Sequence, residues 1–208
     1  MLPFILEVVL VTASGALSPG PLTLATIRKG IEQGWRAGFQ VSVGHTIVEF
    51  SIVLALALGI SHVLTFEISR LIIGLLGGIV LAIYGVSQLK SIWKSSLTDS
   101  CSEYGRSAIW IGLALSAFNP YFIVWWATVG LKLIVDALAY ASFFGIIVMY
   151  VAHVWMDYAW LALLSHLAFK GKQLLSEKSY RVILVLLSLV MLMFAAYFII
   201  DSIFILIS

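Results

Sequence analysis

Long runs of apolar residues fill almost the whole sequence, and their length constrains the fold more than any other feature. They lie near 4–27, 37–60, 68–92, 108–131, 139–167 and 180–206. A helix needs about 20 apolar residues to cross the hydrocarbon core of a bilayer. Lipid offers the backbone no hydrogen-bond partners, so open sheets cannot span it, and these runs are too long for barrel strands. The sequence therefore predicts an all-α membrane protein with six transmembrane helices.

Charged residues are too few to cover a soluble domain of this size. Of the 208 residues, 62% are hydrophobic and 11% are charged. A soluble domain of this length needs a larger polar shell. The N-terminal residues lack the basic region of a cleaved signal peptide, so we expect the first run to be retained. The single Cys101 allows no internal disulfide and has no metal-ligand spacing. We expect no cofactor, no resident metal and no nucleic-acid partner.

The basic residues are concentrated in alternate connections between the apolar runs. The first, third and fifth connections hold ten of the 12 Lys and Arg residues: Arg28, Lys29, Arg36, Lys90, Lys94, Arg106, Lys170, Lys172, Lys178 and Arg181. Loops rich in Lys and Arg face the cytoplasm. We therefore expect a multi-pass protein of the cytoplasmic membrane with both termini on the extracytoplasmic side.

The longest polar segment divides the chain into two halves of three helices. We predict a first three-helix repeat at 1–92, a cytoplasmic connecting loop at 93–107 and a second repeat at 108–208. Three crossings bring the second half to the opposite side of the membrane, so related halves would be inverted repeats. Helix-breaking residues support this relation, because Pro19-Gly20-Pro21 lies in the first run and Asn119-Pro120 lies in the fourth. Breaks at matching positions are typical of a transport site near the bilayer midplane. A single such proline is also compatible with a simple kink.

Two pairs of ionisable residues lie inside the second and fifth runs. His45 precedes Glu49 by four residues, and His153 precedes Asp157 by the same spacing. This spacing puts both members of a pair on one helix face. A charge at the bilayer centre costs about 2.5–3.5 kcal/mol on insertion scales. The pairs therefore indicate a polar cavity that titrates during transport, although a neutral carboxyl bonded to the neighbouring imidazole would fit the same spacing.

The stretch from Ser18 to Glu49 resembles the LysE-type translocators, which include the RhtB-like amino-acid exporters. The resemblance is carried by Pro19-Gly20-Pro21, by the acid Glu49, by Asn119-Pro120 with the aromatic run after it, and by the spaced glycines Gly30, Gly34, Gly38 and Gly44. Leu22, Val48 and Tyr121 depart from the family pattern, which has Asn, Gly and Lys there. The resemblance implies six helices, with breaks in helices 1 and 4, and the transport of a small solute.

This resemblance favours a secondary exporter that moves an amino acid or related solute outward in exchange for protons. The helix starts after Pro19-Gly20-Pro21 and Asn119-Pro120 would receive the substrate carboxylate. Glu49 and Asp157 would bind the ammonium group or the driving proton. His45 and His153 would tune those acids or relay protons, since imidazole titrates near neutral pH.

Two other classes of function, and the oligomeric state, remain open. Two His and two carboxylates would also suit a divalent transition metal as cargo, although no His-rich loop or Cys pair accompanies them. Against an enzyme, the sequence has no His-Glu-x-x-His, no Gly-x-Ser-x-Gly and no phosphate-binding glycine loop. We expect a transporter and not an enzyme. The small residues Gly74, Gly77 and Gly78 would serve packing within the monomer or between subunits of a homo-oligomer.

Overall fold

The computed structural model describes residues 2–18, 20–59, 67–94, 107–172 and 176–207, and these ranges form helices and no strand. The all-α prediction is therefore confirmed for the part of the chain described. Two helical stretches, Trp35–Ala57 and Pro120–Lys172, are long and apolar enough to cross a membrane. Shorter apolar helical stretches are Leu2–Ala13, Gly74–Ser87, Ala108–Ala117 and Ser188–Phe204. The count of six crossings and the inverted relation of the halves stay predictions.

The first half contains α1 (Leu2–Ala16), α2 (Pro21–Gln33), α3 (Trp35–Ala57) and α5 (Glu67–Lys94). The first apolar run is broken between α1 and α2, and Pro21 begins α2. Proline suits a first helical position because the missing N–H would have no intrahelical partner there. The polar stretch 28–36, expected as a connection, is helical on both sides of Gly34. This glycine has a φ of 66°, a conformation that lets the chain turn at a single residue.

The second half contains α6 (Ala108–Ala117), α7 (Pro120–Trp125), the π-helical turn η1 (Trp126–Gly130), α8 (Leu131–Lys172) and α9 (Glu177–Ile207). The fourth apolar run is broken between α6 and α7, at Phe118 and Asn119. The boundary expected between the fourth and fifth runs, at 131–139, lies a few residues later in the structure. The chain stays helical there and kinks at Ala141 and Ser142. The i,i+4 ion pair between Lys132 and Asp136, at 2.7 Å, supports helix where a polar connection was expected.

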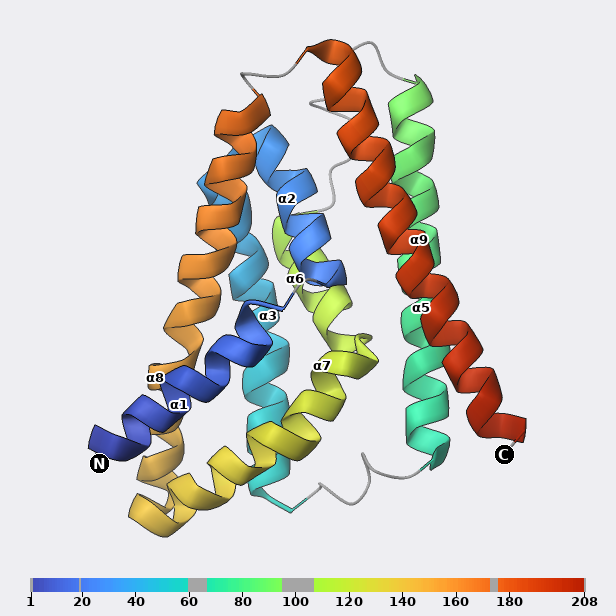
Figure 1. The fold of residues 1–208 in the computed structure, drawn as a ribbon. Helices are drawn as coiled ribbons and strands as arrows, with labels where there is room; N and C mark the ends of the chain where they lie inside the picture. The colour runs from blue at the N-terminus through green and yellow to red at the C-terminus, as the bar shows by residue number, and fades with distance from the viewer. Residues whose placement is uncertain (1, 19, 60–66, 95–106, 173–175, 208) are drawn as a thin grey trace.

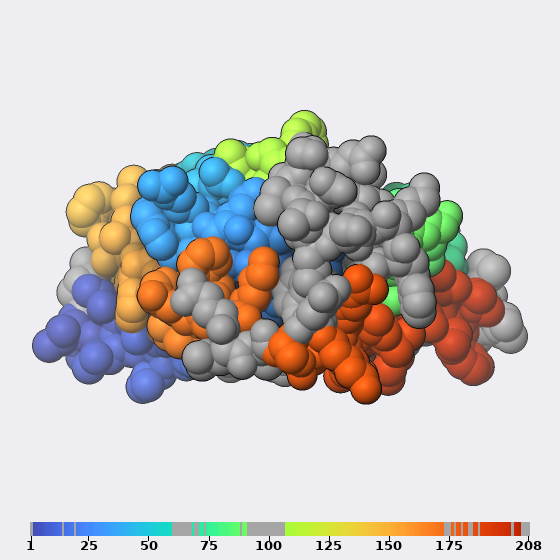
Figure 2. All heavy atoms as spheres, turned by 90° about the horizontal axis from the view of Figure 1, so that it is seen from above, coloured from blue at the N-terminus to red at the C-terminus, as the bar shows by residue number. Residues whose placement is uncertain are grey.

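The helices form two groups that meet along α2 and α6. α3 packs against α6 and α8, and α2 also packs against α8, whereas α5 and α9 lie mainly against each other. Figure 1 shows α5 and α9 as a pair beside the group that contains α1, α3 and α8. α1 begins, and α9 ends, at the same end of the molecule (Figure 1). The end of α2, the start of α3, the end of α8 and the start of α9 lie at the opposite end, which Figure 2 views directly.

Two glycines bring α3 and α6 into backbone contact. A Cβ at Gly44 would collide with the carbonyl of Ile109, and one at Gly112 would collide with the carbonyl of Val41. Close crossings of this kind are typical of helix packing in membranes, where small residues let backbones approach. The crossing fixes α6, and therefore the break that follows it, next to the middle of α3.

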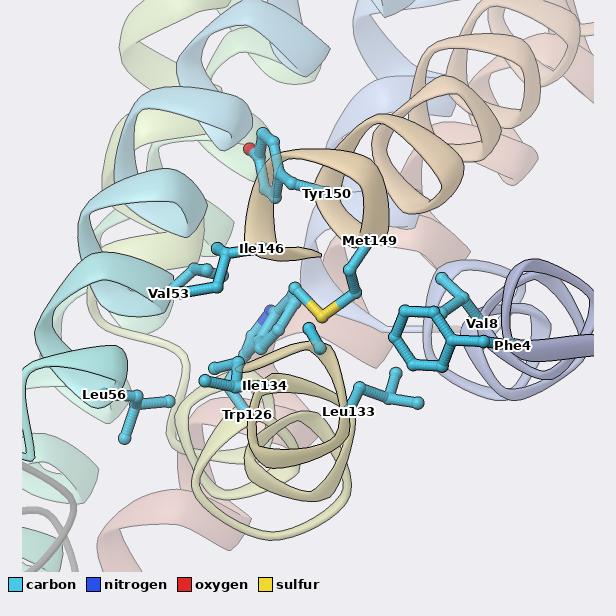
Figure 3. Packing of buried hydrophobic residues seen from close by; sticks show 11 residues of the cluster. Phe4, Val8, Val53, Leu56, Trp126, Leu133, Ile134, Ile146, Met149 and Tyr150 are labelled. Carbon is cyan, nitrogen blue, oxygen red and sulfur yellow. The ribbon is translucent and has the colours of Figure 1, made fainter. Parts of the chain in front are cut away.

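A compact apolar cluster lies near the end that carries the chain termini. It joins Phe4 and Val8 of α1, Val53 and Leu56 of α3, and Met149 of α8 around Trp126 of η1. Figure 3 shows Trp126 between the α3 side chains and Met149, with Phe4 and Val8 beyond. Many large apolar side chains elsewhere are exposed, including Leu10 (74%), Met193 (69%) and Phe204 (67%). Apolar surface of this extent is expected of a protein surrounded by lipid.

Candidate functional site

Two helix breaks frame the candidate site. α1 ends at Ala16, and α2 starts after Gly20, whose backbone is extended with φ −162° and ψ −175°. α6 ends at Ala117, and α7 starts after Asn119, which also has an extended backbone. Both helices that follow a break begin with proline, Pro21 in α2 and Pro120 in α7. Pro19 lies outside the described residues.

The four ionisable residues predicted from the sequence meet between α3 and α8. His45 Nε2 lies 3.2 Å from Glu49 Oε1, one turn along α3. His153 Nε2, from α8, lies 2.9 Å from the same oxygen. Asp157 Oδ2 lies 3.5 Å from His153 Nε2. All four side chains are buried, with Glu49 only 1% exposed. The structure therefore joins the two pairs into one cluster, which sequence spacing alone left undecided.

Glu49 receives two further donors from the second half of the chain. The indole Nε1 of Trp126 donates to Glu49 Oε1 at 3.3 Å. The hydroxyl of Tyr150 donates to Glu49 Oε2 at 3.2 Å. A carboxylate surrounded by four donor groups is stabilised as an anion, because hydrogen bonds to a charged acceptor are stronger than those to a neutral one. Glu49 is thus the electrostatic centre of the cluster.

A hydroxyl group is hydrogen-bonded to Nδ1 of each imidazole, the ring nitrogen that does not face Glu49. Thr12 Oγ1 of α1 lies 2.9 Å from His153 Nδ1, and Ser116 Oγ of α6 lies 2.7 Å from His45 Nδ1. Each His therefore contacts a helix that ends at a break in the opposite half of the chain. These contacts orient both Nε2 atoms toward Glu49, and they fit imidazoles that carry hydrogen on Nε2 and accept it on Nδ1.

Asp157 differs from Glu49 in its surroundings. Asp157 is 6% exposed, and its Oδ2 makes no hydrogen bond to any described residue. A buried carboxylate oxygen without a hydrogen bond is costly, and the 3.5 Å contact with His153 Nε2 is too long to supply one. It is therefore the atom of the cluster with the most to gain from a proton or a cationic group.

A cavity of about 500 Å³ borders the cluster. His45, Glu49, His153 and Asp157 line it together with both helix breaks, which contribute Gly20, Pro21, Asn119 and Pro120. Apolar side chains form most of the remaining wall, among them Phe122, Trp125, Leu161, Phe194 and Phe198. Pockets for small molecules have this size and this mixture of apolar walls with a few polar groups.

Eight of the nine site residues predicted from the sequence therefore line a single cavity, and the ninth is Pro19. Sequence reasoning gave no site role to Thr12, Ser116, Trp126 or Tyr150. Trp126 packs in the apolar cluster, and its indole N–H also reaches Glu49. Tyr150 lies three residues before His153, so its helix face was a signal that could have identified it.

Comparisons with known proteins agree with the resemblance noted in the sequence. The family model of the LysE type translocators matches residues 13–202. The chain is 32% identical over 131 residues to the chemotactic transduction protein ChpE of Pseudomonas aeruginosa. That alignment covers 62% of this chain and 64% of ChpE, so the chain spans slightly less than two thirds of that relative's length. No solved structure matches the chain.

Proposed function

The chain belongs to the LysE type translocator family, and from this premise we propose that it is a secondary active exporter of an amino acid or a related small solute, driven by proton exchange. Membership makes the protein a membrane transporter and argues against an enzyme. The observation that carries the proposal is the buried His and carboxylate cluster beside a cavity between two helix breaks. Ionisable residues inside a membrane are expensive, and they mark ion and substrate paths.

The cluster supplies the groups that such an exchange requires. Asp157 accepts either a proton or the ammonium group of a substrate, so that the two compete for one carboxylate. His45 and His153 relay protons to and from it, because imidazole titrates near neutral pH. The start of α2 at Pro21, which has no side-chain cap, offers partial positive charge to an anionic group.

We propose six crossings arranged as inverted repeats, 1–92 and 108–208, with the segment 93–107 on the cytoplasmic side. Support comes from the two breaks, each followed by a helix that starts with proline, and from the His-acid pair on α3 and on α8. The start of α3 and the ends of α5 and α8 lie at the end of the molecule opposite the termini (Figure 1), and in sequence Arg36, Lys90 and Lys172 belong to these three helix ends. This arrangement fits the expected sidedness, with both termini extracytoplasmic.

The purified protein, reconstituted in liposomes loaded with a mixture of the common amino acids, tests the function. A pH gradient is imposed, and mass spectrometry quantifies which amino acids leave faster than from empty liposomes. We expect selective, gradient-dependent loss of one or a few of them. Folded protein that releases none selectively would refute amino-acid export.

A divalent transition metal is the second candidate cargo, and one observation favours it. His45, Glu49 and Asp157 each offer a ligand atom, and these atoms lie within 4.8 Å of one another. Imidazole and carboxylate are normal ligands for such metals. Ser116 Oγ, 2.7 Å from His45 Nδ1, can accept a hydrogen bond from that nitrogen when Nε2 binds a metal. Metal retained through purification, and lost in His45→Ala, would support this cargo. The same liposomes, loaded with divalent cations, would test its transport.

A further inference from the structure

The two acids of the cluster are not equivalent, although their sequence contexts are alike. Both oxygens of Glu49 are engaged, Oε1 by two imidazoles and an indole and Oε2 by Tyr150. Asp157 Oδ2 makes no hydrogen bond to a described residue, while Asp157 is nine-tenths buried and lines the cavity. A cation entering the cavity would displace hydrogen-bond donors at Glu49, whereas at Asp157 Oδ2 it would compete with no described hydrogen bond and only with the long 3.5 Å contact to His153 Nε2. Asp157 is therefore the residue of the site that receives a cationic group, and we call it the cation-binding pole.

The two helix starts differ in the same way. Asn119 Oδ1 accepts hydrogen bonds from the amides of Tyr121, at 3.1 Å, and Phe122, at 3.4 Å. The first turn of α7 is thus already capped. At the start of α2 the capping residue is Gly20, which has no side chain to accept a hydrogen bond. The amides of Leu22 and Thr23 therefore have no side-chain cap, and both residues line the cavity. An anionic group is favoured at such an uncapped start.

Aromatic rings make up much of the rest of the cavity wall. Phe122 and Trp125 come from the helix after the second break, and Phe194, Tyr197 and Phe198 come from α9. The cavity of about 500 Å³ is within the size range of pockets that hold small molecules, so it has room for a ligand with an apolar body as well as two charged groups. A ligand with a large apolar body would remove this wall from water, at about 25 cal/mol per Å² of apolar surface. A small polar ligand would leave it uncovered.

Resting on the proposed function, we propose that the cargo is a zwitterionic amino acid with a large apolar side chain. Its ammonium group binds Asp157, its carboxylate binds the uncapped start of α2, and its side chain lies against the aromatic wall. Glu49 is then a positioning residue that holds His45, His153, Trp126 and Tyr150. The Asn119 cap keeps the start of α7 out of substrate binding.

A ligand series tests all three contacts on the full chain in lipid nanodiscs by calorimetric titration. L-phenylalanine and L-leucine are compared with 2-phenylethylamine, which lacks the carboxylate, with 3-phenylpropanoate, which lacks the ammonium group, and with L-alanine, which lacks the large body. We expect L-phenylalanine or L-leucine to bind at least tenfold tighter than each of the three truncated ligands. If a truncated ligand binds as tightly as L-phenylalanine and L-leucine, the contact assigned to its missing group is wrong.

Substitutions at the two poles give ligand-dependent effects that misfolding cannot imitate. Gly20→Asn gives α2 the cap that Asn119 gives α7, and a Cβ at Gly20 meets nothing within 4 Å. Gly20→Asn should weaken the binding of L-phenylalanine at least tenfold and leave the binding of 2-phenylethylamine unchanged. Gly20→Ala isolates the effect of the Cβ. Asp157→Asn should weaken the binding of L-phenylalanine at least tenfold and leave the affinity for 3-phenylpropanoate unchanged. Equal losses for the complete and the truncated ligand would contradict the assigned poles.

The proposed function and this inference fail in different ways. Liposomes that export small polar amino acids but not L-phenylalanine or L-leucine would overturn the large apolar cargo and leave amino-acid export standing. Liposomes that export no amino acid at all would overturn both. Export of L-leucine or L-phenylalanine together with the expected ligand series would support both.

Discussion

Glu49 brings together side chains from α3, η1 and α8 at one buried carboxylate. Its Oε1 contacts two imidazoles and the indole of Trp126, and its Oε2 contacts the hydroxyl of Tyr150. Each hydrogen bond to a charged group contributes about 1.5–3 kcal/mol. The cluster therefore stabilises the packing of the two halves of the chain against each other, in addition to lining the cavity.

Replacing Trp126 by Phe tests this stabilisation. The change keeps an aromatic ring in the apolar cluster but removes the N–H that donates to Glu49. We expect a loss of about 1–3 kcal/mol in stability, seen as a lower midpoint of thermal unfolding in detergent. Trp125→Phe is the matched control, because its indole makes no hydrogen bond to Glu49 in the described structure, and its midpoint should fall less. Equal midpoints for the two variants would argue against stabilisation through the indole.

The hydroxyls of Thr12 and Ser116 are expected to stabilise the cluster from outside. Thr12→Val and Ser116→Ala each leave a buried Nδ1 without its partner, at a cost of about 1–3 kcal/mol. Ser51→Ala is the control, since this exposed hydroxyl donates to the carbonyl of Ile47 on its own helix. Chemical unfolding in detergent should separate the two buried variants from the control. Stability losses no larger than that of Ser51→Ala would show that the hydroxyls do not hold the imidazoles.

The sequence predicted the ionisable members of the site but not their partners. Charged residues in an apolar run are conspicuous because burying them is costly, so His45, Glu49, His153 and Asp157 could be found by spacing alone. Thr12, Ser116 and Trp126 are ordinary residues of membrane helices. Only the three-dimensional crossing of α1, α6 and η1 with the cluster gives them a polar partner. Their contacts therefore could not be predicted without the fold.

At the scale of helices, prolines predicted the positions of both breaks, whereas polar residues misplaced the boundary between the fourth and fifth runs. Pro21 and Pro120 begin helices because a missing N–H costs nothing at that position. Lys132 and Asp136 suggested a connection but lie on a continuous helix, where they pair with each other and Lys132 also pairs with Glu7. Exposed ion pairs satisfy charge without ending a helix, and local sequence does not show whether a partner is available.

The crossing of α3 and α6 gives a prediction at this scale. In Gly112→Ala the new methyl group collides with the backbone of Val41 and approaches the amide of His45. We expect the helices to separate, with stability lowered by about 1–3 kcal/mol or more, as overpacking does. Gly171→Ala, where a Cβ meets nothing within 4 Å, should leave stability unchanged or raise it by up to about 1 kcal/mol. Thermal unfolding followed by size-exclusion chromatography measures both. A Gly112→Ala midpoint at or above that of the unsubstituted protein would contradict the close crossing.

At the scale of the whole molecule, the sidedness of the chain is open to direct measurement. Alkaline phosphatase fused after residue 208 should be active in a bacterial host, because we expect the C-terminus outside the cytoplasm. Fluorescent protein fused at the same place should stay dark. Fusions after Gly171, next to the basic residues Lys170 and Lys172, should behave in the opposite way. The reverse pattern would show that the protein is inserted upside down relative to the prediction.

The central claim is that the buried cluster beside the cavity is the transport site, and one comparison of flux tests it most directly. Gradient-driven amino-acid efflux is measured from liposomes that contain the unsubstituted protein, Asp157→Asn or Asp136→Asn. The two substitutions are chemically identical, but Asp157 is buried beside the cavity and Asp136 pairs with exposed Lys132. We predict at least a tenfold loss of flux for Asp157→Asn and flux close to that of the unsubstituted protein for Asp136→Asn. Full gradient-driven flux in Asp157→Asn would contradict the account.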